Sequence, residues 1–265
     1  MDNTVHHAPQ GLQWVVSDIL VMAYRGILRY ISVPQLLIFS TVQPVLFLLL
    51  FTYVFGGAIK VPNGGNYINF LVPGILVQVV IFGSLQTGIG LAEDLSKGLI
   101  DRFRSLPMAR SAVLAGRTLA DFIRNIFVML LMIWVAAIIG FTPEAGFKQI
   151  ALALLLSACL GFAFSWVSAA IGMLVKNAET AQVAGFVWVF PIIFASSIFV
   201  PIETMPDWLQ AFANISPITV TVNSVRALIL NTPIENNLYY SFYWIIGILV
   251  VFIPLSVYIY RKLSS

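Results

Sequence analysis

Charged residues are scarce in this sequence. They make up 9% of its 265 residues, against about a quarter in a typical soluble domain, while 60% of the residues are hydrophobic. No water-soluble fold hides so many apolar side chains. Because lipid offers the backbone no hydrogen-bond partners, a spanning chain must form helices or a closed barrel. The apolar runs are about 20 residues long and do not alternate, which predicts an all-α integral membrane protein.

Signatures of catalysis are missing as well. The single cysteine, Cys159, excludes an intrachain disulfide and a metal site built from cysteine. The phosphate loop G-x-x-x-x-G-K-S/T and the hydrolase motifs H-E-x-x-H and G-x-S-x-G do not occur. The chain is therefore not a recognisable ATPase or hydrolase, and we expect no cofactor in it. Lysine and arginine flank apolar segments, so we expect no nucleic-acid partner.

Six apolar runs are long enough to cross a bilayer. They cover about residues 36–55, 70–91, 119–141, 149–175, 180–200 and 242–260. Residues 1–34 precede them as a polar tail and an amphipathic interfacial helix, and residues 35–265 form the six-span domain. Prolines break the segment 201–230, which is still too apolar for a solvated loop. It predicts an extracellular pair of short re-entrant helices before the last span.

The basic residues predict the orientation of the spans, because lysine and arginine concentrate in cytoplasmic segments. With both termini cytoplasmic, the split is eleven against three. The eleven inside are Arg25, Arg29, Lys97, Arg102, Arg104, Arg110, Arg117, Arg124, Lys176, Arg261 and Lys262, and the three outside are Lys60, Lys148 and Arg226.

Ionisable residues are missing from the deep parts of the spans, which argues against proton coupling, although backbone carbonyls can still bind sodium. Asp121 and Arg124 stand three apart near one end of the third span and can pair on one helix face. We interpret them as a pair that snorkels to the cytoplasmic boundary; the alternative is a proton relay. In the fourth span small residues recur every four positions and predict close helix packing: Ser157, Gly161, Ser165 and Ala169.

A short amphipathic helix is predicted at about residues 94–106, where Pro107 ends it. One face is apolar (Leu95, Leu99, Phe103 and Leu106), and the rest is polar and largely charged (Lys97, Asp101, Arg102, Arg104 and Ser105). Two interpretations stay open. The helix lies on anionic lipid, or it inserts into a groove of a soluble partner.

Aromatic residues form two stripes with a period of four. The first span carries Gln43, Phe47, Phe51 and Phe55, and the fifth carries Gln182, Phe186, Phe190 and Phe194. One amide and three rings on one face suit a wide apolar solute with few polar groups, so the stripes are candidate walls of a translocation path. The alternative is a face that packs on lipid or on a second copy.

The re-entrant segment also has an apolar face, made by Met205, Trp208, Leu209 and Phe212. Two roles are possible for this face. It gates the extracellular end of the path, or it merely plugs the fold.

Several runs resemble the permease subunits of daunorubicin-resistance-type ABC exporters, the type-two class. They are residues 70–76 (FLVPGIL), 101–107 (DRFRSLP), 115–117 (AGR), 214–219 (NISPIT) and 225–228 (VRAL). They occur in family order from about Val33 to Arg261. The resemblance implies an exporter of hydrophobic drugs or lipid-like solutes in a plasma membrane, built from two permeases.

The resemblance further implies a separate ATP-binding subunit, which holds the ATP and magnesium. The helix at 94–106 then becomes the coupling helix that enters this subunit, through Asp94, Leu95, Leu99, Arg102, Phe103, Arg104 and Leu106. Two rival hypotheses remain. One is a membrane scaffold or assembly protein without transport, and the other is an ion-coupled carrier.

Overall fold

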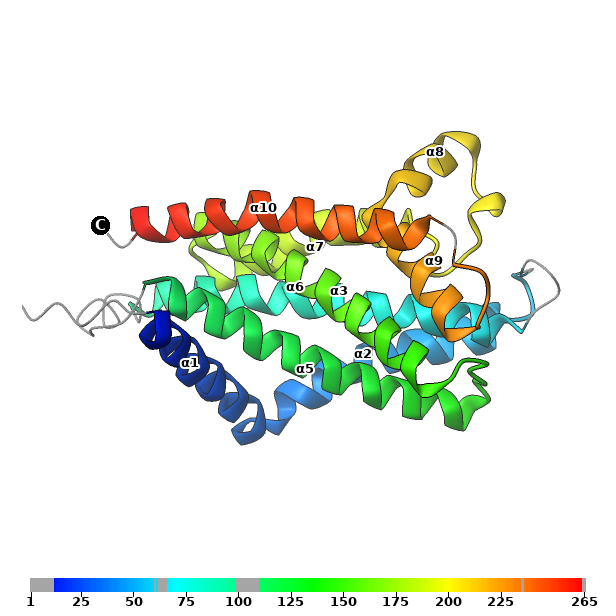
Figure 1. The fold of residues 1–265 in the computed structure, drawn as a ribbon, viewed down its shortest axis with the longest axis horizontal. Coiled ribbons are helices and arrows are strands. Elements are labelled where there is room, and N and C mark those ends of the chain that lie inside the picture. The colour runs from blue at the N-terminus through cyan, green and yellow to red at the C-terminus, as the bar shows by residue number, and fades with distance from the viewer. Residues whose placement is uncertain (1–11, 60, 62–65, 99–109, 235, 264–265) are drawn as a thin grey trace, which may run out of the picture.

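The computed structural model describes residues 12–59, 61, 66–98, 110–234 and 236–263, and in this part of the chain the regular structure is entirely helical. The long helices run roughly along one axis of the molecule (Figure 1). In chain order the elements are α1 (Leu12–Ser32), α2 (Pro34–Leu50), the π-helical turn η1 (Phe51–Phe55), α3 (Tyr67–Ser96), α5 (Arg110–Ile139), α6 (Phe147–Val175), α7 (Ala178–Phe194), the 3-10 turn η3 (Ile202–Thr204), α8 (Asp207–Ile215), α9 (Pro217–Ile229) and α10 (Asn237–Leu263).

The predicted integral membrane character is confirmed. Within the described residues, four helices are long and apolar enough to cross a bilayer: Tyr67–Ser96, Ala112–Ile139, Phe147–Val175 and Asn237–Leu263. The other two predicted spans coincide with shorter apolar helices, Ser40–Phe55 and Ala178–Phe194. Each of the six predicted runs therefore contains a helix.

The fifth run ends earlier than predicted. Its helix α7 stops at Phe194, and the next residues form turns instead of continuing to residue 200. Residues of α9, outside the predicted fifth run, hold these turns in place. The Ser197 amide donates to the Thr219 hydroxyl of α9 at 3.2 Å, and the Ser197 hydroxyl donates to Asn223 at 2.9 Å. Hydropathy alone does not detect such tertiary anchors.

Helix α3 is the central helix, because it is deeply buried and contacts α2, α5, α6, α7 and α9. It packs most closely on α6. A Cβ atom on Gly172 would lie only 2.1 Å from the carbonyl oxygen of Gly88, and a Cβ on Gly161 would lie 2.6 Å from Cβ of Val80. The small-residue stripe of α6 is buried as a whole, so the predicted close packing is confirmed.

Arg226 of α9, which the orientation count assigns to the extracellular side, is half-buried. Its guanidinium carbon lies 3.7 Å from the ring centroid of Phe70 in α3. The same group donates to the carbonyl oxygens of Phe70 at 3.2 Å and Ser197 at 2.8 Å. Arg226 therefore ties α9 to α3 and to the turns after α7.

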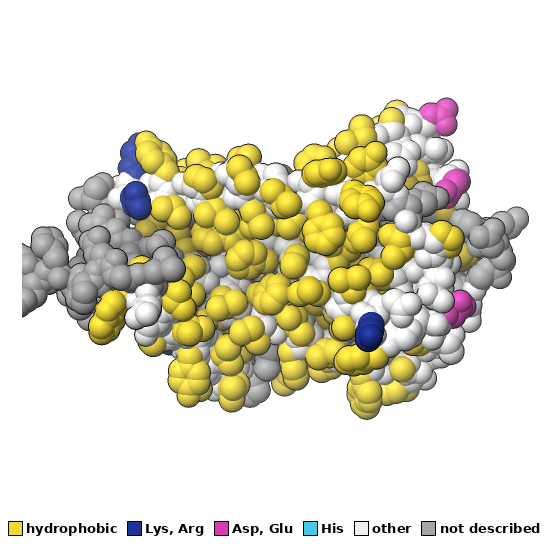
Figure 2. Space-filling model, viewed as in Figure 1, with side chains coloured by type: hydrophobic (Ala, Val, Ile, Leu, Met, Phe, Trp, Pro, Cys, Tyr) yellow, Lys and Arg dark blue, Asp and Glu magenta, His cyan; other side chains and the backbone are white. Residues whose placement is uncertain are grey.

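The surface has the layout of a membrane protein. Figure 2 shows a largely hydrophobic face with basic side chains near one end and acidic side chains at the other, where a basic side chain also lies. The start of α1 and the end of α10 lie at the same end of the molecule (Figure 1). The helices α8 and α9 lie at the opposite end, in the segment where two short helices were predicted.

Candidate functional site

The two predicted aromatic stripes meet in the fold. Phe51 of η1 stacks on Phe199 with ring centroids 4.2 Å apart, and Phe194 of α7 lies 5.1 Å from the same ring. Further along α7, Phe190 packs edge-on against Phe82 of α3 at 5.5 Å. We call the resulting row the aromatic seam; its members are Phe47, Phe51, Phe55, Phe82, Phe186, Phe190, Phe194 and Phe199.

Phe199 and Phe82 are the members that the sequence did not reveal. Phe199 lies in the turns after α7 and is buried, and it joins two helices that are distant in sequence. Phe82 belongs to α3 and has no place in either period of four. The two glutamines of the stripes lie in different surroundings: Gln43 lines a cavity, while Gln182 is exposed on α7.

The seam reaches the outer surface. Phe55, Phe190 and Phe194 are each about two fifths exposed, at 40%, 37% and 45%. Neighbours on α2, η1 and α7 are exposed as well, among them Val42, Leu46, Tyr53, Val54, Val183 and Val187. An apolar surface of this kind needs lipid, a second protein or an apolar solute against it.

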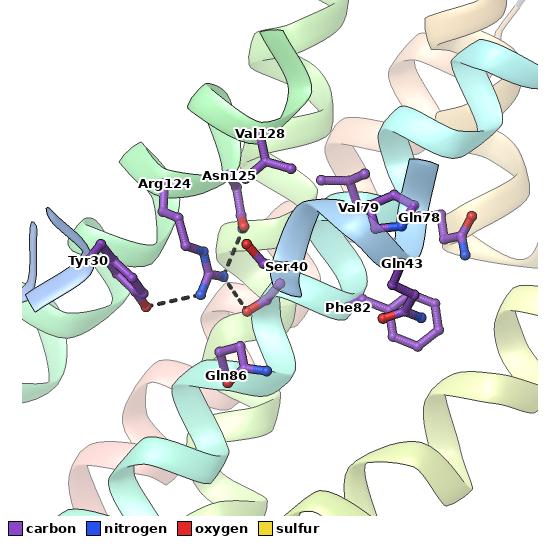
Figure 3. Close-up of a pocket in the computed structure, with 12 residues that line it drawn as sticks. Tyr30, Ser40, Gln43, Gln78, Val79, Phe82, Gln86, Arg124, Asn125 and Val128 are labelled. Carbon is purple, nitrogen blue, oxygen red and sulfur yellow. Dashed lines mark hydrogen bonds between the residues drawn. The ribbon is translucent and has the colours of Figure 1, made fainter. Parts of the chain in front are cut away.

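A polar cavity of about 170 Å³ lies beside the seam, between the end of α1 and helices α2, α3 and α5. Figure 3 shows the side chains that surround it. Polar ones predominate: Tyr30, Ser40, Gln43, Gln78, Gln86, Arg124 and Asn125, with Pro44, Val79, Phe82, Gly83 and Val128 completing the wall. We call it the mid-helix cavity, because Arg124 stands at the midpoint of α5.

The snorkelling interpretation of Asp121 and Arg124 is wrong. Their side chains are 1% and 3% exposed, in that order, and the guanidinium lies 3.3 Å from the carboxylate. Arg124 sits about 21 Å along α5 from its start, too deep to reach the end of the helix. Instead of reaching water, it donates to Tyr30 at 3.0 Å and to the Gly83 carbonyl at 2.7 Å.

Tyr30 connects α1 to this ion pair. Its hydroxyl donates to Asp121 at 2.5 Å, and Thr87 of α3 donates to the other carboxylate oxygen. Burial raises the pKa of Tyr30, and the charge of Asp121 raises that pKa further, so the phenol stays protonated and remains a donor. No sequence pattern predicts this link, since Tyr30 is far from Thr87 and Asp121 along the chain.

A second cavity, of about 480 Å³, adjoins the first, and Tyr30 and Gln86 line both. It lies near the C-terminal end of α3 and the N-terminal end of α5. Its charged lining residues are Arg25, Glu93, Asp94, Lys97, Arg117 and Asp121. We call it the charged vestibule. Inside it Arg117 forms an ion pair with Asp94, and Lys97 forms one with Glu93 at 2.5 Å.

Asp94 and Leu95, predicted to open the amphipathic helix, belong to the last turn of α3. The backbone turns at Gly98, whose φ of +65° lies in the left-handed region that favours glycine, so α3 ends before this residue. The remaining predicted coupling residues, Leu99, Arg102, Phe103, Arg104 and Leu106, lie outside the described residues. Their role stays a prediction.

The predicted gate residues lie on and before α8. Met205 is buried, whereas Trp208 and Phe212 are 74% and 49% exposed, and Leu209 is intermediate. The apolar face of α8 is therefore largely uncovered, and its role as a gate or plug stays a prediction. Among the described residues, no group of three His, Cys, Asp or Glu side chains is placed to hold a metal ion.

Comparison with known proteins gives consistent matches. The family model described as ABC-2 type transporter matches residues 17–230. The chain is 33% identical over 258 residues to a daunorubicin resistance ABC transporter permease protein of Streptomyces coeruleorubidus, covering 94% of this chain and 88% of the relative.

Two further relatives have lower identity. A probable doxorubicin resistance ABC transporter permease protein of Mycobacterium tuberculosis is 27% identical over 252 residues, covering 94% of this chain and 90% of the relative. A putative transport permease of Cyanophora paradoxa is 27% identical over 220 residues, covering 80% and 74%.

Proposed function

Because the chain belongs to the ABC-2 type transporter family, we propose that it is the membrane half of an exporter that moves hydrophobic drugs or lipid-like solutes outward. The observation that carries this proposal is the family match over most of the chain. Two relatives are named for daunorubicin and doxorubicin resistance, which favours planar aromatic drugs as cargo. The aromatic seam offers ring faces on which such molecules can stack.

Six spans with both termini in the cytoplasm of a plasma membrane form the topology that we propose. Helix α2 continues into η1 without a break, which supports a complete first span. The 17 residues of α7 extend about 25 Å, so the turns after Phe194 would complete the fifth span across a core of about 30 Å. Residues 1–34 would lie at the cytoplasmic interface and 35–265 form the permease domain.

A separate ATP-binding subunit supplies the energy in this proposal, and it alone holds ATP and magnesium. The coupling helix after Gly98 docks into that subunit. The charged vestibule lies at the same end of α3, so a movement of the docked segment reaches Asp94 and its partner Arg117 directly. Helix α3, packed backbone to backbone on α6, can carry the movement as a rigid element.

A second permease copy completes the conduit. The exposed apolar residues of α2, η1 and α7 flank the aromatic seam, and a homodimer would cover them and place two seams opposite each other. The path would run between the two copies, and α8 would close its extracellular end.

The proposal is tested with the chain in inverted membrane vesicles together with its ATP-binding partner. We expect ATP-dependent uptake of doxorubicin by wild type and loss of uptake in Phe103→Asp, since an acidic side chain would disrupt an apolar docking face. Pulldown of the partner ATPase should be lost in the same variant, while membrane insertion is retained. Lys176→Asp, at the cytoplasmic end of α6, is the control for added negative charge.

The scaffold hypothesis gives different results. A chain that only assembles other proteins would capture partners but would move no solute, with or without ATP. An ion-coupled carrier would transport without the ATPase and respond to a sodium or proton gradient. Uptake that is independent of ATP would therefore refute the exporter proposal.

A further inference from the structure

Two residues that line the mid-helix cavity each carry a buried polar atom without a partner. Oε1 of Gln78 and Nδ2 of Asn125 accept and donate no hydrogen bond within the described part of the chain. The two side chains are only 1% and 2% exposed. A buried polar group without a partner costs about 1 to 3 kcal/mol, so such atoms call for an occupant of the cavity.

The neighbouring arginine fixes how Asn125 presents its amide. Nη2 of Arg124 donates to Oδ1 of Asn125 at 3.0 Å, which requires an oxygen at that position. The amide therefore cannot be flipped, and Nδ2 is left as a donor for the cavity. Gln78, from α3, can present either its oxygen or its NH₂ group to a ligand, because its oxygen has no partner that would fix the orientation of the amide.

The cavity offers no free positive charge. Nη1 of Arg124 is engaged by Tyr30 and Asp121, and Nη2 is engaged by the Gly83 carbonyl and Asn125. Asp121 neutralises the guanidinium and itself accepts from two hydroxyls. An anion would find the terminal donors occupied, and a cation would meet the guanidinium, so the chemistry favours a neutral ligand with both donor and acceptor groups.

The size and surroundings of the cavity suit part of a larger molecule. A volume of 170 Å³ exceeds many times the roughly 10 to 15 Å³ that one water needs. Phe82 belongs both to the cavity wall and to the aromatic seam, so a ligand with its polar end in the cavity can extend an apolar part along the seam. Through Tyr30 and Gln86 the cavity also adjoins the charged vestibule.

We propose that the mid-helix cavity binds the neutral, hydroxylated head of an amphiphilic solute, with Gln78 and Asn125 as its hydrogen-bond partners. This inference rests on the proposed export function and adds the polar subsite of the cargo. The vestibule between α1, α3 and α5 is the route by which the head enters from the end of the molecule that carries Lys97.

The test is a binding measurement on the purified full chain in lipid nanodiscs, followed by thermal unfolding with tryptophan fluorescence. The probes share one tail and differ in the head: hexyl glucoside, hexyl phosphate and hexyltrimethylammonium, with free glucose as a fourth. We expect a saturable rise in the unfolding temperature with hexyl glucoside alone. Gln78→Leu should weaken this binding about tenfold, the equivalent of one lost hydrogen bond.

Gln78→Leu should fold well, since it removes a buried oxygen that has no partner. Gln43→Leu, at the wall formed by α2, is the second variant, and Gln35→Leu, exposed on the same helix, is the matched control that should bind as wild type does. Equal shifts with all three heads, an equal shift with free glucose, no shift at all, or unchanged binding in Gln78→Leu would each overturn the proposal. The binding measurement needs no ATPase, so its result can be interpreted even if the export assay shows no transport.

Discussion

The buried pair of Asp121 and Arg124 gives the sharpest prediction about stability. Asp121→Asn would leave the guanidinium of Arg124 with only neutral acceptors, at 3% side-chain exposure. Removing one partner of a buried ion pair costs about 3 to 5 kcal/mol, because the other charge stays buried without compensation. For a chain of this size that corresponds to a fall of roughly 10 °C in the unfolding temperature.

The double variant Asp121→Leu with Arg124→Leu separates this cause from general damage. It removes both charges and fills part of the space with apolar atoms, so its loss of stability should be smaller than the sum of the losses in the two single variants. Tyr30 and Thr87 would lose an acceptor in both cases, which makes the single variant Asp121→Leu the proper reference.

The assay is thermal unfolding of the purified chain in nanodiscs, with the four proteins of the cycle measured side by side. A coupling energy of at least 2 kcal/mol is expected from the geometry of the pair. Strictly additive losses, or single variants within about 0.5 kcal/mol of wild type, would refute the view that the two charges depend on each other at this depth.

Two further substitutions test the packing of the fold. Gly172→Val should prevent folding or strongly reduce the amount of folded protein in membranes, because its Cβ would lie 2.1 Å from the carbonyl oxygen of Gly88. Gly247→Val is the control, since no atom lies within 4 Å of the added Cβ. Equal yields of the two variants would contradict the prediction. Arg226→Gln should lower the free energy of unfolding by about 2 kcal/mol, because it removes the contact with the Phe70 ring, and amide hydrogen exchange in α9 should become faster. Unchanged exchange would show that Arg226 does not hold α9 against α3.

The helices were predictable because lipid leaves the backbone little choice, so an apolar run of about 20 residues implies a helix. The ends were less predictable. Gly98 stops α3 through its own backbone conformation, yet the charged residues before it had suggested a new helix from Asp94. At the other end of the molecule, hydrogen bonds to Thr219 and Asn223 hold the turns after α7, and these partners lie far along the chain.

The candidate site was predicted in part. A period of four placed three rings on one face of each helix, and these rings do meet, through Phe199, which contacts Phe51 and Phe194. The role of Arg124 was misjudged because hydropathy treats a charge near a span boundary as exposed. Its true environment depends on α1 folding back so that Tyr30 reaches the guanidinium. Contacts of this kind follow from tertiary structure alone.

The π-helical turn at the end of the first predicted span also determines the direction in which its aromatic side chains point around the helix axis. In an α-helix four residues overshoot one full turn by about 40°, so a stripe with that period winds slowly around the helix. The wider π-helical turn over Phe51–Phe55 rotates by a smaller angle per residue, which reduces this overshoot. The rings of Phe51 and Phe55 therefore stay stacked, with their centroids 5.1 Å apart. Deleting one residue within this turn would change the angle around the helix between Phe51 and Phe55 and break their stacking. The length of the aromatic row is therefore fixed by backbone winding as much as by side-chain identity.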